Sequence, residues 1–113
     1  MYDFKPKMTR KTGPEAVIQI KVEAMLRKYG WFTVTIIGNI FQMGLPDLYC
    51  THSRYGARWI EIKNPKNYRF TAAQLDMFPK LCANGAGVWV LTDDTDWEYQ
   101  KLFRAYNYHE FLN

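Results

Sequence analysis

The sequence predicts an α/β fold in which one mixed β-sheet is flanked by helices. Apolar residues recur at helical spacing in two segments, between residues 12 and 30 and between residues 71 and 85. Short segments rich in β-branched and aromatic residues surround these helices. Glycine, proline and other turn residues separate the segments, so we expect the element order αβββαβ, followed by a last short helix.

The composition is that of one ordinary globular domain. The chain has 113 residues, of which 48% are hydrophobic and 23% charged, so it is unlike a disordered chain. It contains no apolar stretch long enough for a membrane span and no secretory leader, and its two cysteines form no CxxC pair. We therefore expect a cytoplasmic protein with reduced thiols and no membrane partner. The net charge of +4 suits an anionic partner.

The first helix has a clear predicted start and end. Thr12 is the expected N-cap, Pro14 falls in the first turn, and Glu15 lies three residues after Thr12, as in a capping box. Gly30 ends the helix. The segment before it, residues 1–11, is basic and lacks apolar periodicity. We therefore divide the chain into a flexible basic arm over residues 1–11 and a single domain over residues 12–113.

Three strands should follow this helix, over residues 31–37, 47–52 and 58–63. Because short connections link them, they should form an antiparallel meander. Thr71 is the expected N-cap of a second helix that continues to residue 84, and a continuous apolar run at residues 87–91 reads as a strand covered on both faces. A helical connection makes this last strand parallel to the third. Asp94 or Asp96 should then cap a final helix that reaches residue 106.

Polar residues at the second and third strands carry the chemistry. Asp47 follows Gly44-Leu45-Pro46 at the start of the second strand, and Glu61 and Lys63 are two positions apart in the third. Side chains at i and i+2 of a strand point to one face, so Glu61 and Lys63 project together, and strand pairing places Asp47 beside them. A Glu and a Lys within an apolar strand are costly to bury unless they are paired or bind a metal.

A third carboxylate is expected near this pair. On a helical wheel Glu15 shares the face of Ile18, Val22 and Leu26, which turns toward the sheet. Crowded carboxylates repel one another, and a divalent cation with a preference for oxygen ligands, Mg²⁺ or Mn²⁺, relieves that repulsion. Such an ion polarises a phosphoryl oxygen and generates hydroxide from water, while the adjacent ammonium orients the water or stabilises developing charge. These parts suffice for in-line hydrolysis of a phosphodiester.

These motifs resemble the PD-(D/E)XK nuclease superfamily and, within it, the VRR-NUC group. The pattern is Glu15 … Gly44-Leu-Pro-Asp47 … Gly56 … Trp59-Ile-Glu61-Ile-Lys63 … Thr71-Ala-Ala-Gln74 … Gly85, within residues 14–92. The resemblance implies a restriction-endonuclease-like αβββαβ core. It also implies that the metal ligands are Asp47, Glu61 and the backbone carbonyl of Ile62, with Glu15 bound directly or through water. Lys63 would be the catalytic lysine, and Gln74 would help to shape the catalytic site.

Small stand-alone members of this group resemble homodimeric resolvases of four-way (Holliday) DNA junctions from bacteria and phages. The expected function is therefore that of a Mg²⁺-dependent, structure-specific endodeoxyribonuclease, with Mn²⁺ as a substitute, in a bacterial or phage-infected cell. Lys66 and Arg69 directly follow the site and are the candidate DNA phosphate contacts. The alternatives are a flap, nicking or restriction-type endonuclease, or a DNA-binding module with an inactive acidic cluster.

Each of the site residues also has a purely structural explanation. Glu15 and Gln74 both stand at the last position of a capping box. Asp47 could be a turn carboxylate, and Glu61 and Lys63 an exposed charge pair. Their joint occurrence in one topology favours a shared site. The spacing of the two cysteines and two histidines fits no zinc module. The acidic residues between Asp93 and Asp96 fit a helix cap better than a calcium-binding loop.

Overall fold

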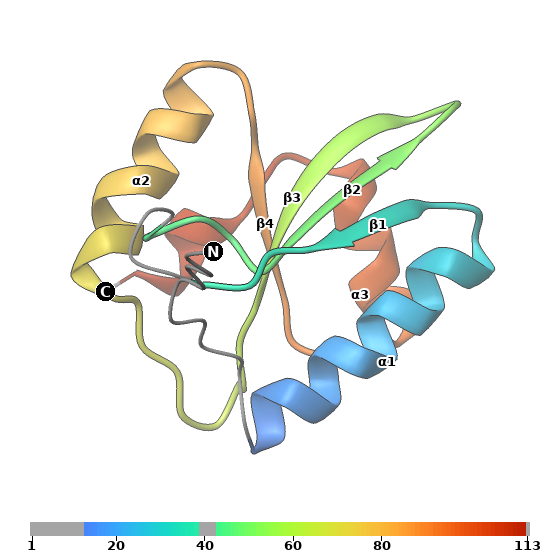
Figure 1. The fold of residues 1–113 in the computed structure, drawn as a ribbon, viewed down its shortest axis with the longest axis horizontal. Coiled ribbons are helices and arrows are strands. Elements are labelled where there is room, and N and C mark those ends of the chain that lie inside the picture. Colours follow the sequence, from blue (N-terminus) through green and yellow to red (C-terminus); the bar gives the residue numbers. More distant parts are fainter. Residues whose placement is uncertain (1–12, 39–42, 113) are drawn as a thin grey trace, which may run out of the picture.

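A computed structural model describes residues 13–38 and 43–112 (Figure 1). The predicted basic arm, Thr12 and part of the loop before Gly44 lie outside the described residues. The elements are α1 (Pro14–Lys28), β1 (Phe32–Thr35), β2 (Leu48–His52), β3 (Gly56–Ile62), α2 (Ala72–Ala83), β4 (Val88–Leu91), α3 (Asp96–Gln100) and the 3₁₀ turns η1 (Lys101–Phe103) and η2 (Tyr108–Phe111). No helix in the described part of the chain is long and apolar enough to cross a membrane.

The four strands form one mixed sheet in the order β1-β2-β3-β4. β1 pairs antiparallel with β2, and β2 pairs antiparallel with β3, so the predicted meander is confirmed. β4 runs parallel to β3, with Glu61 opposite Val90, and α2 makes the connection between them. The αβββαβ order and the mixed sheet that the sequence predicts are therefore both present.

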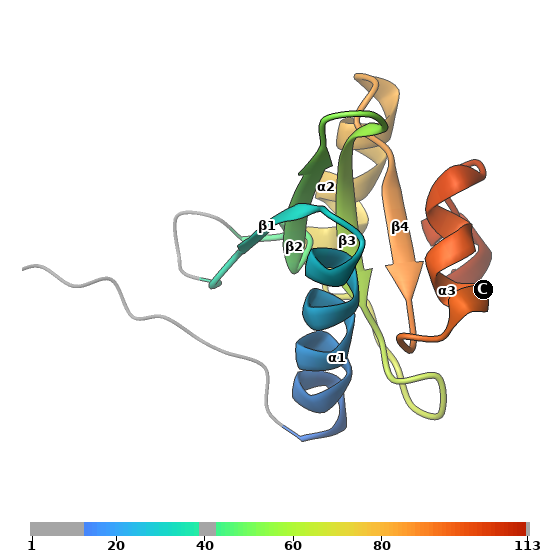
Figure 2. The same ribbon diagram turned by 90° about the vertical axis from the view of Figure 1, so that its right-hand side faces the viewer.

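The two faces of the sheet carry different helices. α1 packs on one face, where its buried Val22 and Leu26 join Leu48, Ile60 and Ile62 in the hydrophobic core. α2 lies on the other side of the sheet (Figure 2). Because side chains alternate along a strand, burial of Ile60 and Ile62 against α1 directs the intervening Glu61 toward the α2 side. The pleat of β3 thus brings a carboxylate to the side of the sheet that carries α2.

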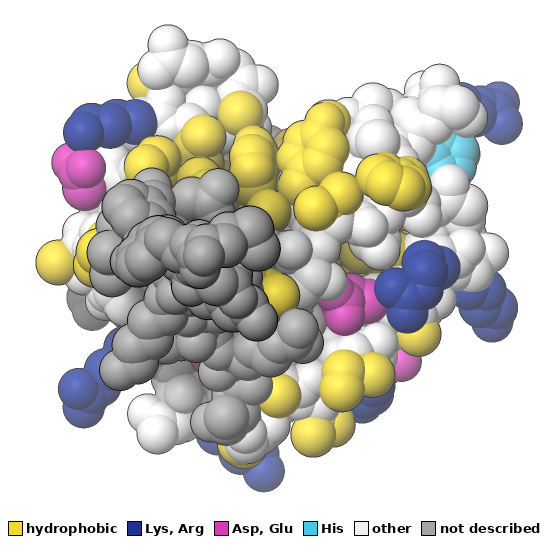
Figure 3. Space-filling view, viewed as in Figure 1, with side chains coloured by type: hydrophobic (Ala, Val, Ile, Leu, Met, Phe, Trp, Pro, Cys, Tyr) yellow, Lys and Arg dark blue, Asp and Glu magenta, His cyan; other side chains and the backbone are white. Residues whose placement is uncertain are grey.

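β1 carries exposed apolar side chains on the α2 side. Thr33 and Thr35 contact α1 through hydrogen bonds with Arg27 and Glu23, so the alternate residues Phe32 and Val34 face the opposite way. Both are exposed. Apolar side chains gather over the sheet between α2 and β1 in the space-filling view (Figure 3). α2 therefore covers only part of its face of the sheet.

At the edge of β4 that faces away from β3, a side chain makes the hydrogen bonds that a neighbouring strand would make. The buried Asn107 accepts a hydrogen bond from the Val90 N–H at 2.7 Å, and its amide group donates to the Val90 carbonyl at 3.2 Å. Both backbone groups of Val90 that face away from β3 are thereby satisfied. The Asn107 amide thus takes the place of a neighbouring strand.

Two helix predictions need correction. The N-cap of α1 is Gly13, which makes no side-chain cap, so Glu15 is the second residue of the helix instead of the third, where a capping-box glutamate lies. The predicted final helix through residue 106 is instead the short α3 and the 3₁₀ turn η1, which ends at Phe103, and the N-cap of α3 is Thr95. This helix ends early because the chain after Arg104 turns back to pair Asn107 with β4.

Candidate active site

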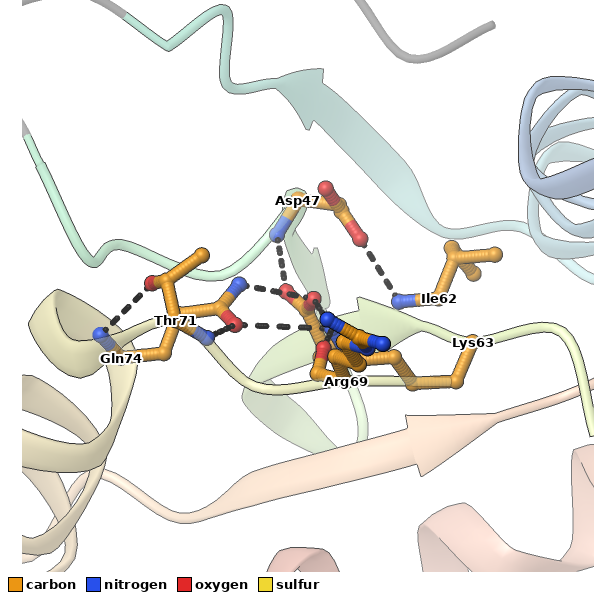
Figure 4. A network of polar contacts seen from close by, with 7 residues as sticks. Asp47, Ile62, Lys63, Arg69, Thr71 and Gln74 are labelled. Atoms are coloured by element: carbon orange, nitrogen blue, oxygen red, sulfur yellow. Dashed lines mark hydrogen bonds and ion pairs between the residues drawn. The ribbon is translucent and has the colours of Figure 1, made fainter. Parts of the chain in front are cut away.

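Asp47 is held by hydrogen bonds with the residue that follows β1 and with two residues of β3. It directly precedes β2, where its carbonyl accepts a hydrogen bond from the Ile36 N–H. Its side chain accepts a hydrogen bond from the Ile62 N–H at 2.7 Å, and its own N–H donates to Glu61 Oε1 at 3.2 Å (Figure 4). These contacts place the two carboxylates beside each other at the end of β3, as the sequence predicts.

The loop that carries Asp47 packs against the first turn of α2. Gly44 has a φ of +88°, and a Cβ atom built there would lie 2.5 Å from the Ala73 carbonyl oxygen. Only glycine combines that backbone conformation with so close an approach. Gly44 therefore brings the Asp47 loop against the helix that carries Gln74.

Glu61 is the fully buried centre of the site, with 0% of its surface exposed. One carboxylate oxygen, Oε2, accepts a hydrogen bond from Gln74 Nε2 at 2.9 Å and lies 3.0 Å from Lys63 Nζ. The other, Oε1, accepts the Asp47 N–H. An ionised carboxylate is tolerated at such depth only when it is paired and hydrogen-bonded, and Glu61 has both kinds of partner.

Lys63 is almost as deeply buried, with 4% of its surface exposed. Besides Glu61, its ammonium donates to the Arg69 carbonyl at 2.6 Å and to Gln74 Oε1 at 3.4 Å. It also lies 4.6 Å from the centre of the Phe70 ring, within the range of a cation–π contact. The ammonium is thus fixed in one position by groups from β3, the loop after it and α2.

Gln74 forms the predicted capping box and also contacts the charged residues of the candidate site. Its backbone N–H donates to Thr71 Oγ1, and its side-chain oxygen accepts the Thr71 N–H, which completes the predicted capping box. The same side chain donates to Glu61 and accepts from Lys63. The cap therefore orients the amide, and the oriented amide joins the carboxylate to the ammonium.

Glu15 does not complete a three-carboxylate group in this structure. Within residues 13–38 and 43–112, no three His, Cys, Asp or Glu side chains are gathered as a metal-binding group. Glu15 lies half-buried at the start of α1, as the second residue of a helix whose N-cap is Gly13. Its role as a third ligand stays a prediction.

The segment between β3 and α2 contributes more than the sequence suggested. The side chains of Lys66 and Arg69 are exposed, as a phosphate contact requires. The sequence reasoning missed the Arg69 carbonyl and the Phe70 ring, both of which contact Lys63. No sequence pattern marks a backbone carbonyl. Phe70, in contrast, is an aromatic residue directly before the N-cap Thr71, and this position close to the site is a signal in the sequence.

The cysteines and histidines stay apart from this site. Burial raises the pKa of the Cys50 thiol to about 12, so it is protonated at neutral pH and is a poor metal ligand. His52 contacts the rings of Trp31 and Tyr55 and accepts the Arg54 N–H. Both cysteines are free, as predicted.

We expect Gly44→Ala to destabilise the domain by about 2 kcal/mol or more, because it adds both a left-handed strain and a clash with α2. Thermal unfolding measures this loss. Gly85→Ala is the matched control, because Gly85 also has a positive φ, +89°, but its Cβ would meet nothing within 4 Å. If the two variants lose the same free energy of unfolding, the contact between the loop and α2 is not the reason for a glycine at position 44.

Comparisons with known proteins support the fold. No family model matches the sequence, and no curated protein matches it either. One solved structure, described as a "VRR_NUC domain", superimposes with a TM-score of 0.67 and 19% sequence identity, over 80% of this chain and 96% of that chain. The α/β architecture built on β2, β3 and α2, which holds Asp47, Glu61, Lys63 and Gln74, is therefore the fold of a VRR_NUC domain.

Proposed function

We propose that this chain is a metal-dependent, structure-specific endodeoxyribonuclease that hydrolyses phosphodiester bonds in four-way DNA junctions as a homodimer. The observation that carries the proposal is the contact network of Asp47, Glu61, Lys63 and Gln74. Glu61 pairs there with the buried Lys63 ammonium at 3.0 Å and accepts hydrogen bonds from Gln74 and from the Asp47 N–H, while the Asp47 carboxylate accepts the neighbouring Ile62 N–H at 2.7 Å. The VRR_NUC fold supports a nuclease of the PD-(D/E)XK type.

The residues present fit a divalent cation. Asp47 and Glu61 offer oxygen donors only, which Mg²⁺ and Mn²⁺ prefer, and they are joined by a hydrogen bond from the Asp47 N–H to Glu61. Together with the Ile62 carbonyl they would hold the ion, with Glu15 as the further ligand that the resemblance implies. When bound, the ion would polarise the phosphoryl oxygen and make water a better nucleophile.

The protein's own groups prepare the rest of the reaction. Lys63 places a positive charge beside Glu61, where it would stabilise the negative charge that develops on the phosphorus oxygens or orient the attacking water. Gln74 and the Arg69 carbonyl hold that ammonium in place before substrate arrives. Fixed donors of this kind need no reorganisation during the reaction, which is why they accelerate it.

DNA is the substrate that the charges favour. The chain carries a net charge of +4, and the exposed Lys66 and Arg69 follow the site directly. Phosphate contacts from such residues release counterions from DNA, so binding should weaken steeply as salt rises. A two-fold symmetric dimer would place two such sites on two strands of a junction, which is the reason for proposing a homodimer.

The test is a panel of labelled four-way junctions, flaps, nicked duplexes and linear duplexes with Mg²⁺ or Mn²⁺, at two salt concentrations. We expect the junctions to be cut fastest, cleavage to disappear with EDTA, and light scattering to report a dimer. Equal cutting of linear duplex would contradict structure specificity, and preferred cutting of flaps or nicks would favour that alternative. DNA binding without any cleavage would instead favour a non-catalytic DNA-binding module.

A further inference from the structure

We propose that a cavity beside the candidate active site binds an unpaired base of the DNA strand that is cut. The inference rests on the proposed nuclease function and specifies the substrate of the same site. The cavity is a hollow that is widely open to solvent, with a volume of about 500 Å³. We call it the base pocket, and it is lined by Tyr68, Arg69, Phe70, Leu75, Phe111 and Leu112.

The base pocket shares a wall with the catalytic lysine. Arg69 and Phe70 line the pocket, and the same two residues contact Lys63 Nζ through the Arg69 carbonyl, at 2.6 Å, and the Phe70 ring, at 4.6 Å. Figure 4 shows Arg69 beside Lys63, on the segment that leads to Thr71. A phosphate bound next to Lys63 therefore has the adjoining nucleotide of its strand close to the pocket.

The lining of the pocket suits a nucleobase. Three of the lining residues are aromatic, and bases stack on such rings with about 1–3 kcal/mol per base, largely regardless of sequence. The Tyr68 ring makes edge contacts with Phe70 and Phe111, and Phe70 makes one with the buried Phe78, so the rings are already held in place. The walls therefore exist before any ligand binds.

The charge at the pocket distinguishes a nucleotide from a purely apolar ligand. Arg69 is exposed and is one of the lining residues. A guanidinium there pairs with the phosphate of a nucleotide whose base enters among the rings. An aromatic cavity with a cationic side chain, next to a phosphodiester-cleaving site, fits one nucleotide of the cut strand better than a peptide or lipid.

The pocket makes an unpaired base a determinant of specificity. A base in a duplex must leave its stack and its partner to enter, which costs a few kcal/mol, whereas a base at a branch point or in a bulge is already mobile. Substrates that supply a mobile base next to the cut gain the stacking energy without that cost. The base pocket would thus select branched or distorted DNA through base accessibility alone.

Leu75→Trp is the variant that tests the base pocket. Leu75 is 48% exposed on α2, so an indole can fill the pocket from its rim without entering the core. The control is Ile20→Trp, which makes a similar change at a side chain 66% exposed on α1. Leu75→Asp serves as a second variant if the tryptophan disturbs folding, because its carboxylate would repel the nucleotide phosphate.

The assay compares junctions that carry one unpaired base on the 5′ or the 3′ side of the cut with a fully paired junction. We expect wild type and Ile20→Trp to cut one of the unpaired substrates about tenfold faster than the paired one, and Leu75→Trp to cut both at similar rates. A wild-type ratio near one, or a ratio that a folded Leu75→Trp variant preserves, would overturn the base pocket.

A binding measurement separates this proposal from the proposed function. The same junctions carry 2-aminopurine as the unpaired base, and its fluorescence is followed in EDTA, where no cleavage occurs. We expect a change with wild type that is lost with Leu75→Trp and kept with Ile20→Trp. If wild type cuts no DNA, the nuclease function fails while this measurement still decides the pocket, and the absence of a wild-type change would refute it.

Discussion

Asp47→Asn is expected to abolish DNA cleavage while the fold and DNA binding are retained. An asparagine oxygen can still accept the Ile62 N–H, and the side chain is only half-buried, so the loop should keep its position. The substitution removes one of the two negative charges that would hold the cation, which is worth several kcal/mol and hence about 10³-fold or more in rate. Cleavage with Mg²⁺, thermal unfolding and DNA binding in EDTA measure the three properties.

Glu61→Gln is the informative comparison, because it should lose cleavage and stability together. Glu61 accepts hydrogen bonds on both oxygens and pairs with a buried ammonium, so an amide there would point its NH₂ group at a donor and leave Lys63 without its counter-charge.

The outcome that would contradict the proposed chemistry concerns the first variant. If Asp47→Asn cuts DNA within tenfold of the wild-type rate, the proposed chemistry is wrong.

Lys63→Met should slow cleavage by about 10²–10³-fold, the usual loss when one preorganised group that stabilises transition-state charge is removed. Cation binding should persist, because Asp47 and Glu61 remain and the competing positive charge beside Glu61 is gone. A thermal shift with Mn²⁺ detects that binding independently of activity. The variant should also be destabilised, by about 3–5 kcal/mol, since it leaves a buried carboxylate without its ionic partner.

Lys66→Met is the control for this prediction, because Lys66 is an exposed lysine three residues further along the same segment. As a phosphate contact it should weaken binding evenly across DNA forms and lower the salt slope by about one, while DNA that is already bound is cut at the normal rate. A folded Lys63→Met variant that cuts bound DNA as fast as wild type would remove the lysine from the mechanism.

Local patterns in the sequence predicted most of the fold because they agree with the tertiary structure. The alternation around Glu61 indicated a strand with two different faces, and the structure buries Ile60 and Ile62 on one of them. The last helix was predicted too long because nothing in the local pattern reveals that Asn107 pairs with the backbone of β4. That contact joins residues 17 positions apart, so only the assembled structure can show it.

The site was predictable to the extent that side-chain types define it. Asp47, Glu61, Lys63 and Gln74 come together because strand pairing and a capping box put them there, and both features have sequence signatures. The Arg69 carbonyl and the base pocket had none, since a backbone oxygen can belong to any residue and a cavity depends on how distant segments pack. Glu15 was placed from a helical wheel, which gives a direction but not a distance.

The site draws its four side chains from residues 47–74, a single stretch of chain that contains only one hairpin, one connecting segment and one helix start. Contacts of such short sequence separation lose little chain entropy on closing, so they should form early in the folding of the domain. The parallel β3–β4 pair must wait for a longer loop to close, and the contact of Asn107 with the edge of β4 should follow once β4 is in place. Substitutions in this stretch should therefore alter the rate of folding as well as the chemistry, and those at Asn107 should mainly speed unfolding.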